Sequence, residues 1–81
     1  MEHEEIFQRL KAVIAICLEI GPENINLDSS FVDDLDVDSI EKNSLLTDLE
    51  LEFDLDIPDE NVADIVSVRE AVDYLFDEIN L

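Results

Sequence analysis

The sequence predicts an all-α fold, a bundle of four helices with a long loop between the first two and a short third helix. Apolar residues recur at three- and four-residue steps in several segments, which is the period of one helix face. The 81 residues include one glycine and two prolines, which suits helices joined by few sharp turns. At this length we expect one domain over residues 1–81.

The first helix is expected over residues 4–20. Its apolar face consists of Ile6, Leu10, Val13, Ile14, Cys17 and Leu18. Gly21 is predicted to cap its C-terminus, and Pro22 cannot continue the helix. Residues 23–37 have no helical period and are rich in Asn, Asp and Ser, so they are expected to form a loop. Five apolar residues are expected to hold this loop to the core: Ile25, Leu27, Phe31, Val32 and Leu35.

The second helix is expected over residues 39–53. Asp38 is its candidate N-cap, and Glu41, three residues on, completes the spacing of a capping box. The inward face would consist of Leu45, Leu46, Leu49 and Phe53.

Two further helices follow. Asp59 is expected to cap a short third helix over residues 60–65, which would bury Val62 and Ile65. Ser67 and Glu70 form a second capping-box pattern, which starts the last helix over residues 68–80. Its apolar stripe consists of Val68, Ala71, Val72, Leu75, Phe76 and Ile79.

The charge of the chain excludes several classes of protein. With 23 acidic and four basic residues, the net charge is −19, so nucleic acid and anionic lipid would repel it. The apolar content of 47% is enough for a core, which argues against disorder. The longest apolar run, residues 12–18, is too short to span a bilayer. We therefore expect a cytoplasmic protein with no membrane span.

The residue types of common catalytic sites are scarce. The only histidine, His3, is near the N-terminus, where we expect a solvated side chain rather than a catalytic base. The only cysteine, Cys17, lies on an apolar helix face and is predicted to be an inert core residue. An 81-residue bundle also has little room for the deep cleft that separates the pKa values of paired carboxylates. We predict that the protein is not an enzyme.

An EF-hand calcium site is also excluded, while weak divalent binding to the acidic loops stays open. The aspartates at positions 34, 36 and 38 have the spacing with which an EF-hand loop begins. However, the required glycine falls at Ser39 and the bidentate glutamate at Leu45. No dedicated metal site is predicted.

Asp38 and Ser39 remain, at the start of the second helix. An anion esterified to Ser39 would face unpaired backbone N–H groups and the positive end of the helix dipole. From these residues alone, a second reading stays open, in which Asp38 and Ser39 only cap the helix.

Three blocks of the sequence resemble the acyl carrier protein family. Residues 31–40, FVDDLDVDSI, are similar to the family's signature, in which Asp-Ser-Leu follows a Phe-x-x-Asp-Leu stretch. Residues 49–60, LELEFDLDIPDE, match the end of its second helix and its Ile-Pro-Asp-Glu turn, and residues 71–75, AVDYL, match its last helix. The blocks occur in the family's order and spacing, and the resemblance as a whole extends over nearly the whole chain.

The resemblance implies that Ser39 bears 4′-phosphopantetheine, attached from coenzyme A by a phosphopantetheinyl transferase that Asp38 helps to dock. The thiol of this arm would hold acyl groups as thioesters for fatty-acid or related acyl biosynthesis, so the chain would be a monomeric carrier. Its partners would be acyl-processing synthases or acyltransferases with basic docking patches. The implied partner face consists of Ile40, Glu41, Asn43, Ser44, Thr47, Asp48, Glu50 and Leu51. The implied acyl pocket consists of Leu45, Leu46, Leu49, Ile57, Ile65 and Ala71.

The sequence also departs from the family. The family often has Gly at Asp36, aliphatic residues at Asn43 and Thr47, and acidic residues at Ser44 and Leu51. These departures favour a specialised carrier for a polyketide, peptidyl or lipid-modification pathway. The alternatives are an ordinary fatty-acid carrier with a diverged face, and a non-carrying acidic adaptor of the same fold.

The acidity is unevenly distributed. Fourteen of the 23 carboxylates lie in residues 28–64, where Lys42 is the only base. Opposite potentials accelerate encounter between partners and weaken with salt. The acidity therefore indicates a docking surface around Ser39 and the helix that it begins.

Overall fold

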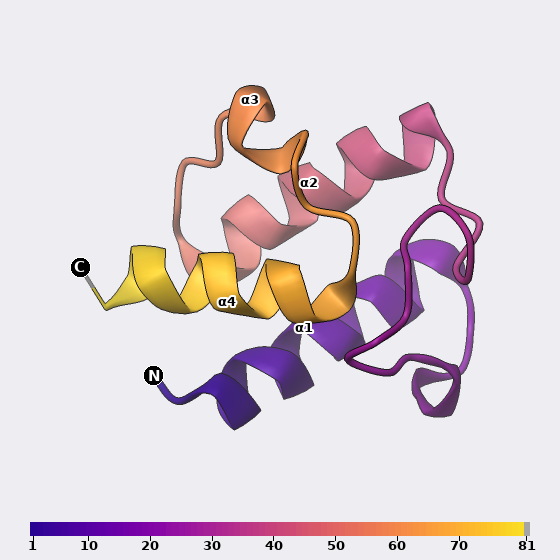
Figure 1. The fold of residues 1–81 in the computed structure, drawn as a ribbon, viewed down its shortest axis with the longest axis horizontal. Coiled ribbons are helices and arrows are strands. Elements are labelled where there is room, and N and C mark those ends of the chain that lie inside the picture. Colours follow the sequence, from indigo (N-terminus) through magenta and orange to yellow (C-terminus); the bar gives the residue numbers. More distant parts are fainter. Residues whose placement is uncertain (81) are drawn as a thin grey trace.

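The computed structural model describes residues 1–80 and is helical (Figure 1). The three long helices are α1 (His3–Leu18), α2 (Ser39–Phe53) and α4 (Val68–Ile79), and α3 (Asp59–Val62) is a single turn. A 3₁₀ turn, η1 (Pro22–Asn24), lies in the long connection from α1 to α2. Within residues 1–80 there is no strand, only an isolated antiparallel bridge between Ser30 and Ser67. The predicted all-α class, with a long first loop and a short third helix, is confirmed.

Helix α1 is at the centre of the packing. Ile6, Leu10 and Ile14 are spaced four residues apart, lie on one face and are fully buried. Through this face α1 packs against both α2 and α4. Val68 and Leu75 of α4 are fully buried with them. The rest of the core consists of Ile25, Leu45, Leu49, Phe53, Ile57, Ala71 and Val72.

The end of α1 differs from the prediction. The helix ends at Leu18, and Glu19 takes the left-handed conformation with φ of 57°. The N–H of Ile20 then donates to the carbonyl of Ala15 at 3.1 Å, and Ile20 packs against the core. Gly21 has an extended backbone and precedes η1, so the prediction that it caps α1 is wrong. The helix ends early because this turn brings Ile20 to the core.

The long loop is anchored to the start of α4. The N–H of Phe31 donates to the carbonyl of Val66 at 3.0 Å, and that of Val68 to the carbonyl of Ser29 at 3.0 Å. Four of the five predicted anchors, Ile25, Leu27, Phe31 and Leu35, are buried in the core or packed against it. The fifth, Val32, is 67% exposed, so that part of the prediction is wrong. The loop turns at Val32, which leaves its side chain outside the core.

Both predicted capping boxes are present. Asp38 Oδ1 accepts the N–H of Glu41 at 2.8 Å, and Glu41 Oε1 accepts the N–H of Asp38 at 3.2 Å. At the start of α4, Ser67 Oγ accepts the N–H of Glu70 at 3.3 Å, and Glu70 Oε1 accepts the N–H of Ser67 at 3.1 Å. These bonds satisfy N–H groups that the first turn of a helix leaves without partners. Helix α2 has the predicted bounds.

Helix α3 is shorter than predicted. It begins at Asp59 with Pro58 as its N-cap, and no side chain caps it, so Asp59 is not the cap. Val62 and Ile65 are half-buried against the core. A bond of 3.1 Å from Asn61 Nδ2 to the hydroxyl of Tyr74 links this turn to α4.

His3 is exposed, as predicted, and it also contacts α4. Its ring stacks on Phe76 with centroids 3.8 Å apart, and its Nε2 lies 3.4 Å from Asp73 Oδ1. Both partners belong to α4, so the first turn of α1 is fixed to the C-terminal helix. His3 contributes to this contact between helices.

Candidate functional site

Ser39 is the first residue of α2, and its side chain is exposed. Because Asp38 and Glu41 cap the helix, Ser39 is not needed for capping. Among residues 1–80, no hydrogen bond involves its hydroxyl. Of the second reading, in which Asp38 and Ser39 only cap the helix, the structure shows the cap by Asp38 and none by the Ser39 hydroxyl. The geometry leaves an accessible hydroxyl at a helix N-terminus, where an attached anion is favoured.

The loop that leads to Ser39 is held by short-range bonds. Asp34 Oδ2 accepts the N–H of Ser30 at 2.7 Å, and the N–H of Val37 donates to the carbonyl of Phe31 at 2.9 Å. Between them, Asp36 has φ of 55°, the left-handed region that favours glycine and admits aspartate. Asp36, where the acyl carrier protein family often has glycine, thus adopts a left-handed backbone conformation.

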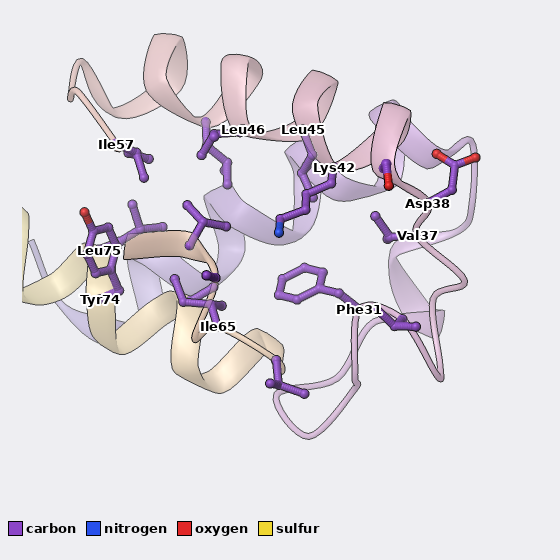
Figure 2. Close-up of a pocket in the computed structure, with 17 residues that line it drawn as sticks. Phe31, Val37, Asp38, Lys42, Leu45, Leu46, Ile57, Ile65, Tyr74 and Leu75 are labelled. Carbon is purple, nitrogen blue, oxygen red and sulfur yellow. The ribbon is translucent and has the colours of Figure 1, made fainter. Parts of the chain in front are cut away.

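A cavity of about 360 Å³ opens beside Ser39 between α2, α3, α4 and the long loop (Figure 2). Its lining includes Ser39, Asp38 and all six residues assigned to an acyl pocket: Leu45, Leu46, Leu49, Ile57, Ile65 and Ala71. The structure therefore brings these six residues together next to Ser39. An apolar cavity of this size suits a small hydrophobic ligand.

The lining also contains residues that sequence reasoning missed. They are Phe31, Val32, Val37, Lys42, Val62, Ala63, Val66, Tyr74 and Leu75. Helical spacing contains the signal for Lys42, which is three residues after Ser39 and three before Leu45. No local pattern points to the loop residues, because their position depends on how the loop folds back on α4.

The predicted partner face of α2 is only partly available. Ile40 and Leu51 are 76% and 77% exposed. Asn43, Ser44, Thr47 and Asp48 are also exposed. Glu41 and Glu50 are half-buried and have internal partners, since Glu41 belongs to the capping box and Glu50 Oε2 accepts the N–H of Ile57 at 3.0 Å. These two carboxylates therefore stabilise the fold at the same time as they add charge to the face.

Cys17 lies half-buried on α1 near the start of α2. Burial raises the pKa of its thiol, and the nearby carboxylates of Asp48 and Glu41 raise it further. A raised pKa leaves less reactive thiolate at neutral pH. This environment agrees with the prediction of an inert cysteine.

No helix within residues 1–80 is both long and apolar enough to cross a bilayer. In the same residues, no three side chains of His, Cys, Asp or Glu are grouped so that they could hold a metal ion.

An exposed serine at a helix start, beside an apolar cavity in an acidic helical bundle, is an arrangement that suits a carrier of a covalently attached group. Residues 8–75 match the family model described as a phosphopantetheine attachment site. The chain is also 37% identical over 81 residues to an acyl carrier protein of Petrotoga mobilis, which covers 100% of this chain and 95% of that relative. The chain belongs to the acyl carrier protein family.

This membership confirms the predicted family and carrier function, and it implies a covalently attached 4′-phosphopantetheine. Acyl carrier proteins are carriers rather than catalysts, and they interact with phosphopantetheinyl transferases and acyl-processing enzymes. The residues present fit the prosthetic group, because the Ser39 hydroxyl is exposed, has no hydrogen-bond partner among residues 1–80 and borders the cavity.

Proposed function

We propose that residues 1–81 form one carrier domain in which Ser39 is the attachment residue. The observation that carries this proposal is the free hydroxyl of Ser39 next to a complete capping box. When bound, the arm supplies a terminal thiol that holds an acyl group as a thioester. Asp38 and Glu41 fix the first turn of α2, so the serine is presented at a rigid helix start. The exposed carboxylate side of Asp38 is available to a transferase.

The cavity supports a second role, the shelter of the acyl chain. Ser39 is part of its lining, and most of its walls are the apolar side chains of α2, α3 and α4. Burial of apolar surface stabilises by about 25 cal/mol per Å², so a hydrocarbon chain favours this space over water. The six predicted pocket residues would form its walls.

The exposed part of α2 is proposed as the partner face. Carboxylates surround it, and Lys42 is the only base in residues 28–64, so a partner with a basic patch is steered toward Ser39. Ile40 and Leu51 add apolar contact area at the two ends of this face. We infer a monomer, since a net charge of −19 repels a second copy. A cytoplasmic location is in keeping with the free thiol of Cys17.

Attachment is tested by intact mass spectrometry after incubation with coenzyme A and a broad-specificity phosphopantetheinyl transferase. The wild-type chain should gain the mass of one arm. Ser39→Ala should gain none and should still fold, because the cap of α2 is Asp38. No gain by the wild type, or an equal gain by Ser39→Ala, would contradict the assignment.

The pathway requires a separate experiment. We propose a specialised carrier rather than a general fatty-acid carrier, because Ser44 and Leu51 interrupt the acidity of the partner face. The loaded chain should be a poor substrate for general fatty-acid synthase enzymes at low salt. Efficient elongation on this carrier would show that the diverged face still serves the general pathway.

A further inference from the structure

Lys42 differs from the charged residues around it. Asp38 stands four residues before it and Glu41 directly before it, yet the ion pairs within residues 1–80 do not include Lys42. Its side chain instead lines the cavity. Figure 2 shows its amino nitrogen turned inward toward the ring of Phe31, while the carboxylate of Asp38 points away from the cavity. The only base of the acidic region thus faces the acyl pocket.

A second hydrogen-bond donor lies at the other end of the cavity. The hydroxyl of Tyr74, opposite Lys42 in Figure 2, accepts a bond from Asn61 Nδ2 at 3.1 Å and keeps its own proton to donate. Most of the lining between the two is aliphatic. A saturated hydrocarbon that filled this space would cover the Lys42 ammonium and give it no acceptor. Covering an unpaired charged donor is unfavourable.

We propose that Lys42 is a specificity-determining residue that favours oxygenated acyl groups, those with a hydroxyl or keto oxygen, over saturated chains of the same length. This inference rests on the proposed function, since the acyl group must reach the cavity from Ser39. A neutral oxygen fits better than a carboxylate, because the 14 carboxylates of residues 28–64 repel an anionic cargo. The side chain of Lys42 is exposed, so water hydrates its ammonium before an acyl group enters. An acyl oxygen replaces the acceptor that is lost when the acyl group displaces this water.

The test compares two acyl groups on the same carrier. The full chain is loaded at Ser39 with a saturated acyl group and, separately, with its hydroxylated counterpart of equal length. The readout is the rate at which hydroxylamine cleaves each thioester, because a sheltered acyl group is cleaved slowly. In the wild type, the hydroxylated group should be the better protected of the two.

Lys42→Met keeps the length and apolar stem of the side chain and removes its charge. It should reduce the preference for the hydroxylated group by about tenfold, the value of one charge-assisted hydrogen bond. Lys11→Met is the matched control, because it removes the same charge from α1, where the Lys11 ammonium lies 4.9 Å from the centre of the Phe7 ring. An unchanged preference in Lys42→Met, or an equal loss in Lys11→Met, would overturn the inference.

The phosphodiester of the 4′-phosphopantetheine arm is another possible acceptor for the Lys42 ammonium. The chain that carries the arm but no acyl group tests this alternative. If Lys42→Met shifts the phosphorus resonance of that form and leaves the acyl preference unchanged, the ammonium binds the phosphodiester and the inference is wrong. Mass spectrometry of the loaded samples separates the two proposals. Failure to load would overturn the proposed function and this inference with it, whereas loading with unchanged preference would overturn the inference alone.

Discussion

Replacement of Asp38 by alanine is predicted to destabilise the chain without removing the hydroxyl of Ser39. Asp38 Oδ1 accepts the N–H of Glu41 at 2.8 Å, and this bond is lost in Asp38→Ala. Loss of an aspartate N-cap costs about 1 kcal/mol. In a domain of this size, a change of about 1 kcal/mol lowers the melting temperature by roughly 4–8 °C. Thermal unfolding followed by far-ultraviolet circular dichroism measures this shift.

Two matched variants distinguish the capping bond of Asp38 from the effect of its charge and from the effect of the Ser39 hydroxyl. Asp38→Asn keeps an acceptor oxygen and removes the negative charge, so its free energy of unfolding should stay within about 0.5 kcal/mol of the wild type. Ser39→Ala should also stay within that range, since no hydrogen bond of residues 1–80 involves its hydroxyl. If Ser39→Ala lost as much stability as Asp38→Ala, Ser39 would contribute to the cap. The conclusion that its hydroxyl makes no stabilising hydrogen bond would then be refuted.

Three more predictions follow from the geometry. Glu50→Ala should lower the free energy of unfolding by about 1 kcal/mol, because Glu50 Oε2 accepts the N–H of Ile57 at 3.0 Å, whereas Asp48→Ala should stay within about 0.5 kcal/mol. Equal losses in denaturant melts would contradict this difference. Sodium chloride or magnesium should raise the melting temperature by screening the carboxylates of residues 28–64, and no upward shift would argue against self-repulsion there. Cys17 should be alkylated more slowly in the folded than in the unfolded chain at the same pH, because its raised pKa leaves less thiolate; equal rates by mass spectrometry would contradict that.

The helix starts could be predicted from the sequence because short-range chemistry fixes them. Asp38 with Glu41, and Ser67 with Glu70, satisfy N–H groups within one turn, so four residues suffice to locate each start. The predicted starts of α2 and α4 are confirmed for this reason.

The end of α1 depends on tertiary packing, whereas the end of α2 at Phe53 is as predicted. Glu19 takes the left-handed conformation that usually favours glycine. It precedes Ile20, which packs against the core. Burial of Ile20 accompanies this turn, and the local sequence does not reveal it. Gly21, the residue that looked like a cap, was therefore misassigned.

The site could be predicted in part. The six pocket residues came from a family resemblance, and the structure places all six on one cavity. Asp38 was correctly identified as the N-cap of α2. The internal bond of Glu50 spans seven residues in sequence and crosses from α2 to the turn before α3, so spacing along one helix gave no indication of it. The position of Lys42 on the cavity could have been predicted from helical spacing, because it lies three residues after Ser39 and three before Leu45.

The position of α1 in the packing has a consequence for cargo. The five fully buried side chains belong to α1 and α4, and α1 contributes no wall to the cavity. Helix α3, which does form part of a wall, has no buried residue. Under the proposed function, acyl groups of different bulk would contact α2, α3 and α4 but not α1. The packing of α1 would therefore stay the same while the contents of the cavity change.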